Sequence, residues 1–228
     1  MSLKTCVTAY GKMCFYGKDE YIGRSLYNYG EWSGDECDKL LSLANGLFVD
    51  VGANVGYFSL ALSSKVPVVA FEPQPELYKL LVRNTGLGHN VALSSSEGTA
   101  VMPKIRYGDR GNYGGLGLGY RSELGTITVE TRTLDSYNLD VGLLKIDVEG
   151  HELEVLKGGV ETISRCSPIM YIEDDRDDKR ESLRKFIKYL GYNIEEHNPS
   201  MYRENNYFGL KKNIWDRNYI SKNIICWK

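Results

Sequence analysis

The sequence of 228 residues has no long apolar run and no pair of cysteines at the spacing of a metal or redox motif. Its apolar runs reach only about half a dozen residues, whereas a helix that crosses a bilayer needs about 20. The N-terminus lacks the apolar segment of a secretory signal peptide. The five cysteines are odd in number and widely spread, which favours reduced thiols. These absences predict a soluble, cytoplasmic protein with no membrane partner, no disulfide frame and no zinc site.

A charge excess is also absent, since the formal net charge is −2. This balance gives no field that attracts phosphates, so we expect no nucleic-acid partner. The hydrophobic and charged fractions, 42% and 25%, are ordinary for a folded globular chain. At this length, the simplest expectation is one domain with a sizeable core.

Beyond residue 46, short β-rich apolar runs alternate with segments of helical periodicity. The runs have the length of buried strands, and the helical segments carry an apolar stripe. The order strand, helix, strand predicts an α/β fold with a mostly parallel, doubly wound sheet. The expected strands are 47–51, 67–71, 90–94, 99–107, 143–148, 168–173 and 192–197, and the expected helices are 55–64, 75–85, 151–164 and 178–190.

The sheet is expected to end in an antiparallel hairpin. Segment 206–211 also has β character, and only a short polar connection separates it from 192–197. Because no helix lies between them, the two strands should run in opposite directions. We therefore expect one α/β domain over 47–212, preceded by a leader, 1–46, and followed by a basic tail, 213–228.

Two segments fall outside the alternation of strands and helices. The leader has helical periodicity near 35–45, and we expect Gly46 to end this helix as its C-terminal cap. Residues 108–119 hold six glycines in twelve positions. Such a stretch suits either a flexible surface linker or a mobile lid over a substrate, and both interpretations stay open.

Two of the predicted strands end at a carboxylate. In LFVDVGANVG, at 47–56, the apolar run stops at Asp50, and in VPVVAFEP, at 66–73, it stops at Glu72. The carboxyl ends of parallel strands meet at one edge of a sheet, where open α/β proteins bind ligands. We therefore expect both acids to face one shared ligand.

The turn after Asp50 has the residues that a close ligand approach requires. Gly52 allows a tight turn, Asn54 tolerates positive φ, and Gly56 lets the following helix pack against the strand. The N-terminus of that helix offers free N–H groups and a partial positive charge. Glu72, 22 residues after Asp50, is placed where a ribose diol would be held.

The charges at this turn favour S-adenosylmethionine over a nicotinamide dinucleotide. Dinucleotide sites have a second glycine, for the pyrophosphate, where this sequence has Ala53 and Asn54. Asp50 would repel a pyrophosphate but suits an ammonium or sulfonium group. S-adenosylmethionine carries both of these cations and has a ribose for Glu72. We therefore predict S-adenosylmethionine as the cofactor.

A second group of acids follows the later strands. In LLKIDVEGHE, Asp147 stands at the strand tip, with Glu149 and His151 soon after it. S-adenosylmethionine is already activated, so the protein must align the acceptor and, for a hydroxyl, remove its proton. Asp147, Glu149 and His151 are the candidate catalytic residues, although Glu149 also suits a helix cap and His151 a solvated helix start. Asp147 with Glu173 and Asp174 could hold Mg²⁺, but EDDRDD equally suits a solvated acidic run, so no metal is predicted.

The sequence resembles the FkbM-like methyltransferases over nearly its whole length. The resemblance implies a Rossmann-like class I methyltransferase fold, with S-adenosylmethionine as methyl donor. It also implies O-methylation of a sugar or another small polar metabolite. The similar motifs are GRSLYNYGEW at 23–32, DVGANVGYFSL at 50–60, FEPQPELYKLLVRN at 71–84, TLDSY at 133–137, KIDVEGHELEVLKGG at 145–159 and NNYFGL at 205–210.

The resemblance further implies which positions bind the cofactor. Motif positions carry over to this sequence residue by residue, so each implied role can be compared with the structure. The implied residues are Asp50, Gly52, Ala53, Asn54 and Gly56 on the methionine side, Glu72 at the ribose, Pro73, Ser94 and Ser95 near the adenine, and Asp147 at the same site.

Two other functions stay open. Segment 211–228 carries four lysines and one arginine against one aspartate, interleaved with Trp215, Tyr219 and Trp227. Aromatic residues among cations can stack on bases, which makes an RNA methyltransferase one alternative. Against it, no N-P-P-[YFW] motif and no Pro-Cys nucleophile is present. A nucleotide-binding module without catalysis is the other alternative, and the convergent acids count against it.

Overall fold

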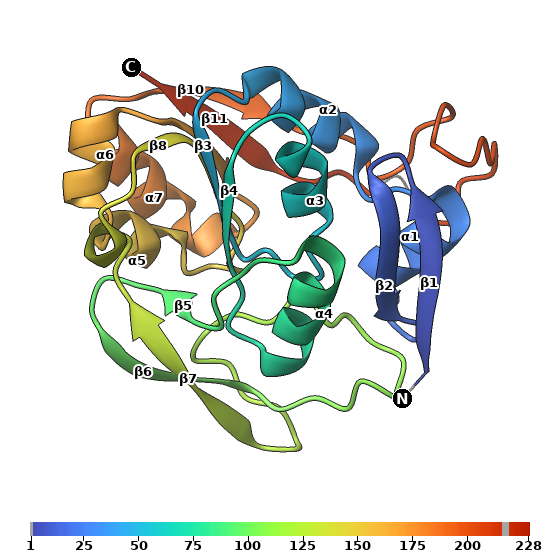
Figure 1. Ribbon diagram of the computed structural model, residues 1–228. Helices are drawn as coiled ribbons and strands as arrows, with labels where there is room; N and C mark the ends of the chain where they lie inside the picture. Colours follow the sequence, from blue (N-terminus) through green and yellow to red (C-terminus); the bar gives the residue numbers. More distant parts are fainter. Residues whose placement is uncertain (1, 216–218) are drawn as a thin grey trace.

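The computed structural model describes residues 2–215 and 219–228 and contains a six-stranded sheet (Figure 1). Its strand order is β10-β11-β9-β8-β3-β4, with β4, β3, β8 and β9 parallel and β11 antiparallel to both of its neighbours. The predicted α/β fold with a mostly parallel, doubly wound sheet is confirmed. The strands are β3 (Leu47–Val51), β4 (Val68–Phe71), β8 (Val141–Ile146), β9 (Ile169–Glu173), β10 (Asn193–His197) and β11 (Asn223–Trp227).

Both faces of the central strands of this sheet are buried. Phe48 and Leu143 enter one core, and the next residue of each strand, Val49 and Leu144, enters the other. Because neither face meets solvent, these strands are apolar almost throughout. Helices α2 (Gly34–Leu43), α3 (Tyr57–Ser63) and α4 (Pro75–Thr85) close the first core, and α5 (Glu152–Lys157), α6 (Val160–Cys166) and α7 (Asp177–Tyr189) close the second. Among the described residues, no helix has the length and apolar composition needed to cross a bilayer.

A second, three-stranded sheet lies beside the end of the main sheet that carries the site (Figure 1). The predicted helix over 151–164 is divided into α5 and α6 at Gly158, where a Cβ atom would stand 2.0 Å from the Ser94 carbonyl oxygen. The strands of the second sheet are β5 (Ala92–Leu93), β6 (Gly98–Pro103) and β7 (Thr126–Arg132), in the order β5-β7-β6, and the 3-10 helix η1 (Asp135–Tyr137) follows them.

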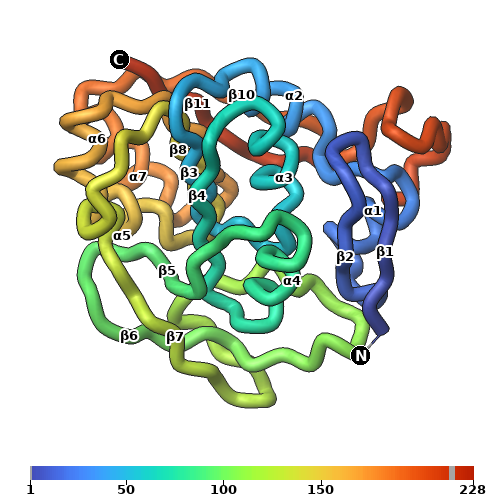
Figure 2. The backbone as a smooth tube through the Cα atoms, viewed as in Figure 1, coloured from blue at the N-terminus to red at the C-terminus, as the bar shows by residue number. Residues whose placement is uncertain are grey.

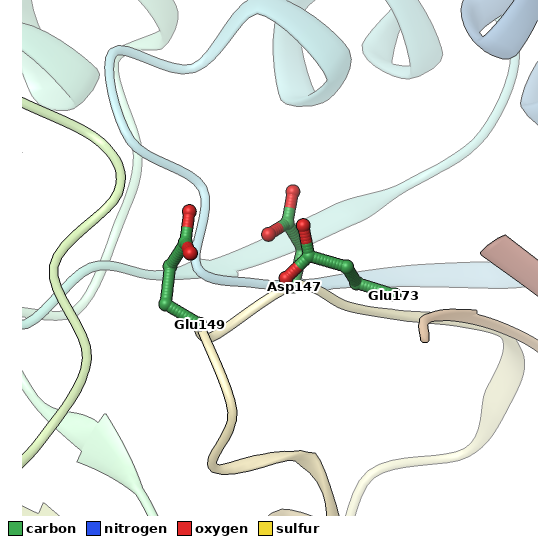
Figure 3. A group of neighbouring side chains, drawn as sticks. All are labelled: Asp147, Glu149 and Glu173. Carbon is green, nitrogen blue, oxygen red and sulfur yellow. The ribbon is translucent and has the colours of Figure 1, made fainter. Parts of the chain in front are cut away.

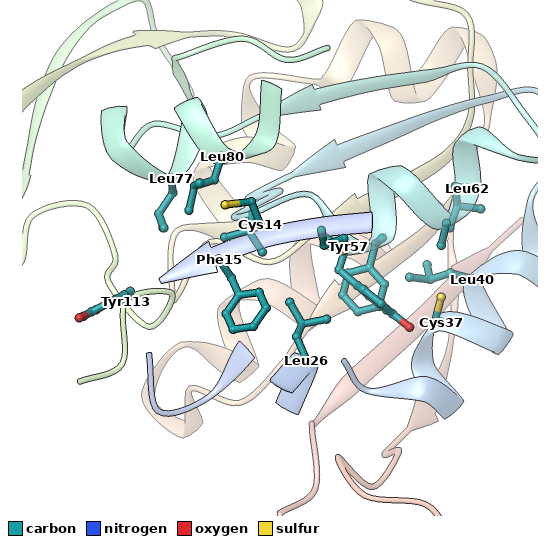
Figure 4. Close-up of a cluster of buried hydrophobic side chains, with 14 of the residues drawn as sticks. Cys14, Phe15, Leu26, Cys37, Leu40, Tyr57, Leu62, Leu77, Leu80 and Tyr113 are labelled. Carbon is teal, nitrogen blue, oxygen red and sulfur yellow. The ribbon is translucent and has the colours of Figure 1, made fainter. Parts of the chain in front are cut away.

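The leader is more ordered than the sequence predicts. It begins with a hairpin of β1 (Leu3–Thr8) and β2 (Gly11–Tyr16), followed by α1 (Ile22–Tyr29). Figure 4 shows Cys14 and Phe15 of β2 packed among side chains of the first core. The predicted helix near 35–45 is α2, but Gly46 is not its cap, because the helix ends at Leu43 and its cap, Ala44, is extended. The leader is thus part of the first core.

The predicted antiparallel hairpin forms, but its second strand is not the predicted segment 206–211. Segment 206–211 forms no strand; instead, the N–H of Phe208 donates to the Tyr29 carbonyl at 2.9 Å. The partner of β10 is β11, which lies inside the sheet between β9 and β10. Ile224 and Ile225 enter opposite cores, so the last strand is held by burial on both faces. The expectation of a separate tail is therefore wrong for 223–227.

The leader and the segment before β11 lie side by side, as Figure 2 shows in blue and red. Arg24 of α1 donates to the Ile214 carbonyl at 2.6 Å, and the Tyr29 hydroxyl accepts from the Ile214 N–H at 2.7 Å. Asp216 and Arg217, which contribute to the charge of the predicted basic tail, lie outside the described residues. The two ends of the chain therefore build one side of the molecule together.

We predict that Ile224→Ala lowers the free energy of unfolding by about 2–5 kcal/mol, because it empties a fully buried position in the second core. Ile220→Ala is the matched control, since that side chain is 56% exposed, and it should change the unfolding free energy by less than about 0.5 kcal/mol. Urea denaturation measures both variants. Equal, small effects would contradict the place of β11 inside the sheet.

Candidate functional site

A cavity of about 470 Å³ opens at the carboxyl ends of the parallel strands. Its volume lies in the usual range for a small-molecule site. Three parts of the chain line it: the strand tips of the α/β sheet, the leader, and the segment before β11. The lining includes residues 51–55, 71–74, 91–93, 114–116, 145 and 147–149 from the body of the chain, Tyr21, Ile22, Trp32 and Glu36 from the leader, and Met201 and 219–222 from the C-terminal part.

The turn after β3 lines the cavity as predicted. The N–H groups of Gly52 and Ala53 both donate to the Phe71 carbonyl at 3.0 Å, which ties the turn to β4. Gly52 has φ +84°, and a Cβ atom there would stand 1.8 Å from the carbonyl oxygen of Asp147. Asn54 has φ +53°, and its Oδ1 accepts from the Val55 N–H at 2.8 Å. Gly52 is therefore required by the adjacent strand end, and not only by ligand access.

Gly56 serves packing away from the cavity. Its φ is +87°, and a Cβ atom would lie 2.7 Å from Leu81 and 2.9 Å from Thr85, both on α4. The sequence predicted a close approach between helix and strand, whereas the structure shows the turn before α3 packed against α4. Gly56 thus shapes the turn and is not part of the cavity wall.

Glu72, at the tip of β4, holds its carboxylate where it could bind the two hydroxyls of a diol. Only 4% of the residue is exposed, yet it borders the cavity. Its two carboxylate oxygens accept from the N–H groups of Asn54 and Gln74, each at 2.8 Å. Burial raises the pKa of Glu72 to about 7, against these hydrogen bonds, which lower it. Each oxygen has a further lone pair, so the carboxylate can accept hydrogen bonds from two ligand hydroxyls.

Asp50 is placed differently from the prediction. It is fully buried and does not reach the cavity wall. The Ser59 hydroxyl donates to its Oδ2 at 2.6 Å, while its Oδ1 lies 3.9 Å from the Lys145 ammonium and accepts no hydrogen bond. Burial raises its pKa, and Lys145 opposes this rise. Asp50 therefore supports the cavity floor instead of touching the bound ligand.

The predicted adenine contacts are partly displaced. Pro73 lines the cavity, but Ser94 and Ser95 do not. Ser94 instead pairs its hydroxyl with Nε2 of His151 at 2.9 Å. The apolar residues 91–93, directly before the two serines, face the cavity, together with Met102 and Leu118. The apolar run itself was the signal in the sequence, since a flat adenine ring packs against apolar side chains.

Asp147, Glu149 and Glu173 meet at the strand tips (Figure 3), and one oxygen of each lies within 4.8 Å of the others. Glu149, held at φ +57°, pairs with Arg176, whereas Glu173 Oε2 is buried and accepts no hydrogen bond. Burial and neighbouring carboxylates raise the pKa of Glu149 to about 8 and that of Glu173 well above its usual range. Three such oxygens could hold a divalent cation or accept hydrogen bonds from hydroxyls.

Of two other residues that the sequence pointed to, His151 lines the cavity and Asp174 does not. His151 lines the cavity next to α5, and burial lowers its pKa, so it is neutral near pH 7. Asp174, considered above as a metal ligand, points elsewhere and pairs with Arg184 at 2.6 Å and with Arg180 at 3.3 Å. The structure therefore brings Glu149, not Asp174, to the acidic group.

Two charged residues of the site were missed in the sequence. Lys145 is only 1% exposed, and its ammonium lies 3.0 Å from Asp147 Oδ2 and 5.0 Å from the Phe58 ring centroid. Burial opposes its charge, but the carboxylates of Asp147, Asp50 and Glu36 outweigh burial and raise its pKa. The position of Lys145 inside the apolar run LLKID could have identified it from the sequence. No sequence feature in the leader indicated Glu36.

The glycine-rich segment forms one wall of the cavity. Asn112, Leu116 and Leu118 line it, and the buried Gln74 donates to the Tyr113 carbonyl at 3.0 Å. The segment is thus tied to the strand tip at Glu72 in this conformation. Whether it also moves as a lid stays a prediction.

The chain is similar to known methyltransferases. Residues 50–198 match the family model described as the methyltransferase FkbM domain. Methyltransferase sdnD of Sordaria araneosa is 32% identical over 173 residues, covering 57% of this chain and 67% of that protein. Hexuronic acid methyltransferase AglP of Haloferax volcanii is 34% identical over 121 residues and 48% of each chain, so this chain spans about half the length of that relative.

A solved structure shows the same fold. Methyltransferase FkbM from Methylobacillus flagellatus superimposes with a TM-score of 0.53 at 17% identity, over 81% of this chain and 45% of that one. At this identity the likeness concerns the fold, and it agrees with the Rossmann-like methyltransferase architecture.

Proposed function

Because the chain belongs to the FkbM methyltransferase domain family, we propose that it transfers the methyl group of S-adenosylmethionine to a hydroxyl of a small polar acceptor, in particular a sugar. When bound, S-adenosylmethionine supplies a methyl group on a sulfonium, which needs no further activation. The observation that carries the proposal is the position of Glu72, with both oxygens held by backbone N–H groups at the edge of the cavity. The chain's own task is to hold the two reactants in line.

The cavity wall fits S-adenosylmethionine part by part. Glu72 can accept both hydroxyls of a ribose, and the apolar residues 91–93 with Met102 offer a surface for an adenine. The carboxylates of Asp147 and Glu149 lie on the same wall and suit the ammonium and sulfonium groups. Dinucleotide-binding turns have a glycine where this chain has Ala53 and Asn54, so a pyrophosphate has less room to approach here.

A hydroxyl acceptor fits the acidic end of the cavity. Asp147, Glu149 and Glu173 can accept hydrogen bonds from sugar hydroxyls and orient one of them. Lys145 and Arg176, which also border the cavity, supply cations for a carboxylated sugar. The similarity to a protein named as a hexuronic acid methyltransferase supports this class of acceptor.

The two alternative functions have less support. The acids at the strand tips would repel the phosphates of an RNA, and the net charge of −2 gives no compensating attraction. A binding module without catalysis would not need carboxylates that converge on the end of the cavity away from the apolar adenine surface.

We predict that Glu72→Ala weakens binding of S-adenosylhomocysteine by about 1–3 kcal/mol, because the ribose hydroxyls lose a charged hydrogen-bond partner. Isothermal titration calorimetry measures the change. Glu76→Ala is the matched control, since Glu76 pairs with Lys79 and with the Tyr16 hydroxyl outside the cavity lining and should leave the affinity unchanged. Tighter binding of NAD than of S-adenosylhomocysteine by the unaltered protein, or full affinity in Glu72→Ala, would contradict the cofactor assignment.

We predict that Asp147→Asn lowers methyl transfer about 100-fold, the lower range for losing a group that orients or deprotonates a hydroxyl. The affinity for S-adenosylhomocysteine should fall less than in Glu72→Ala, since Glu72 still holds the ribose and Glu149 still faces the ammonium group. Transfer of isotope-labelled methyl from S-adenosylmethionine to glucuronate and glucose measures the turnover.

The control for an RNA acceptor is charge reversal of the exposed Lys211 and Lys212, which should leave turnover unchanged. Label on RNA together with loss of activity in the reversed variant would show that the acceptor is a nucleic acid.

A further inference from the structure

We propose that Glu36, which lies in the leader and outside the residues matched by the family, contacts the acceptor hydroxyl and takes up its proton. This role rests on the proposed methyl transfer and deepens it, because it names the proton acceptor and the segment that supplies it.

Glu36 belongs to the leader, near the start of the sequence, and lines the same cavity as the acids at the strand tips. It lies in the first turn of α2, is only 5% exposed, and lines the cavity together with Trp32. The Ser33 hydroxyl donates to its Oε2 at 2.9 Å. A buried carboxylate on a cavity wall is costly unless it is paired or serves a ligand. Glu36 is therefore a candidate for direct contact with the acceptor.

A clamp fixes the start of α2 against the C-terminal part of the chain. Arg203 donates to both oxygens of the buried Glu31, at 2.7 and 3.0 Å, and to Asp38 at 2.5 Å. The guanidinium lies so close to the helix that a Cβ atom on Gly34 would stand 2.3 Å from its Nε. Only Asp35 separates Gly34 from Glu36, so the clamp holds the carboxylate at a fixed place on the wall. Such rigidity is what a group that meets a reacting atom requires.

The charges distinguish Glu36 from Asp147. The Lys145 ammonium occupies Oδ2 of Asp147 at 3.0 Å, whereas no cation of the described residues lies within 4.0 Å of Glu36. The charged or titratable groups that face Glu36 are Lys145 on β8, Asp147 directly after β8, Asp50 on β3 and Tyr171 on β9. Burial raises the pKa of Glu36 to about 7, and Lys145 opposes the rise. A base with this pKa is effective near neutral pH.

The proposed step is balanced. The acceptor oxygen forms a bond to the methyl carbon with its lone pair, and the carbon–sulfur bond breaks with its electron pair left on sulfur. The hydroxyl proton moves to the Glu36 carboxylate, which becomes neutral and later releases the proton to water. Asp147, whose charge Lys145 balances, accepts a hydrogen bond from the same hydroxyl and so orients it. No oxidant, reductant or further reactant is needed.

The test compares Glu36→Gln and Glu36→Asp with the matched control Asp35→Asn, which removes a carboxylate that is 50% exposed from the same turn of α2. Labelled methyl transfer is measured from pH 5.5 to 9 with glucuronate, with glucose and with a small-molecule metabolite extract. Glu36→Gln should lower turnover by about 100-fold or more, and Asp35→Asn by less than about twofold. The affinity for S-adenosylhomocysteine and the melting temperature should stay close to those of the unaltered protein in all three variants.

The pH profile separates proton transfer from a structural role. The unaltered protein needs ionised Glu36, so its rate should fall as the pH drops through about 7. Glu36→Gln should lose this acid limb, and Glu36→Asp should keep it at a reduced rate. The rates are taken at saturating S-adenosylmethionine, so that protonation of Glu72, whose pKa is also raised to about 7, does not limit turnover. Glu149, whose pKa is raised to about 8, is unchanged in these variants, so a limb near pH 7 that disappears only in Glu36→Gln belongs to Glu36.

Three results would overturn the role of Glu36: a rate in Glu36→Gln within about threefold of the original, an acid limb that persists in that variant, or a lost affinity for S-adenosylhomocysteine. Label that enters the extract but neither sugar would refute the sugar acceptor, while the same variants still decide the role of Glu36 on the labelled extract. No label from the unaltered protein with any acceptor would refute the methyl transfer itself, and the role of Glu36 with it.

Discussion

The site depends on one buried cation. The Lys145 ammonium lies in the interior of the sheet, and its charge is retained because Asp50, Asp147 and Glu36 surround it. Removing an ammonium from water costs several kcal/mol, which only close carboxylates can offset. These carboxylates come from β3, from the end of β8 and from α2, so one charge group joins the sheet to the leader. The cavity floor is consequently fixed before any ligand binds.

The cavity divides into two parts of different origin. Residues within the family match, 50–198, supply Glu72, which we propose holds the ribose, and the apolar surface that we propose for an adenine. The leader and the segment before β11 supply the opposite wall, and the Arg203 clamp holds these two segments together. On the proposed function, the shared core binds the methyl donor, and the flanking segments decide which acceptor fits. Relatives with the same core can then act on different acceptors by changing their ends.

Local sequence patterns, such as apolar runs and helical periodicity, correctly predicted the elements whose formation depends on nearby residues. The apolar strands and their order with the helices follow from burial on both faces of a parallel sheet. Of the two carboxylates expected at the strand tips, Glu72 borders the cavity and Asp50 does not. The strand at 206–211 was wrong because 223–227 has the same β character, and only long-range packing decides which of them enters the sheet. The place of Glu36 at the cavity could not be predicted, since only the folded chain brings it near Lys145, more than 100 residues further along the sequence. Ser94 and Ser95, which the resemblance placed near an adenine, do not line the cavity, whereas the apolar residues 91–93 directly before them do.

A double-mutant cycle on Lys145 and Asp50 tests the central claim most directly. Unfolding free energies are measured by urea denaturation for Lys145→Met, Asp50→Asn and the double variant. If the buried cation holds the site together, Lys145→Met costs about 3–5 kcal/mol, since it leaves buried carboxylates without their counterion. The double variant should then be more stable than the sum of the single effects by more than about 1.5 kcal/mol. Additivity within about 0.5 kcal/mol would show that the two charges act independently and would contradict this account.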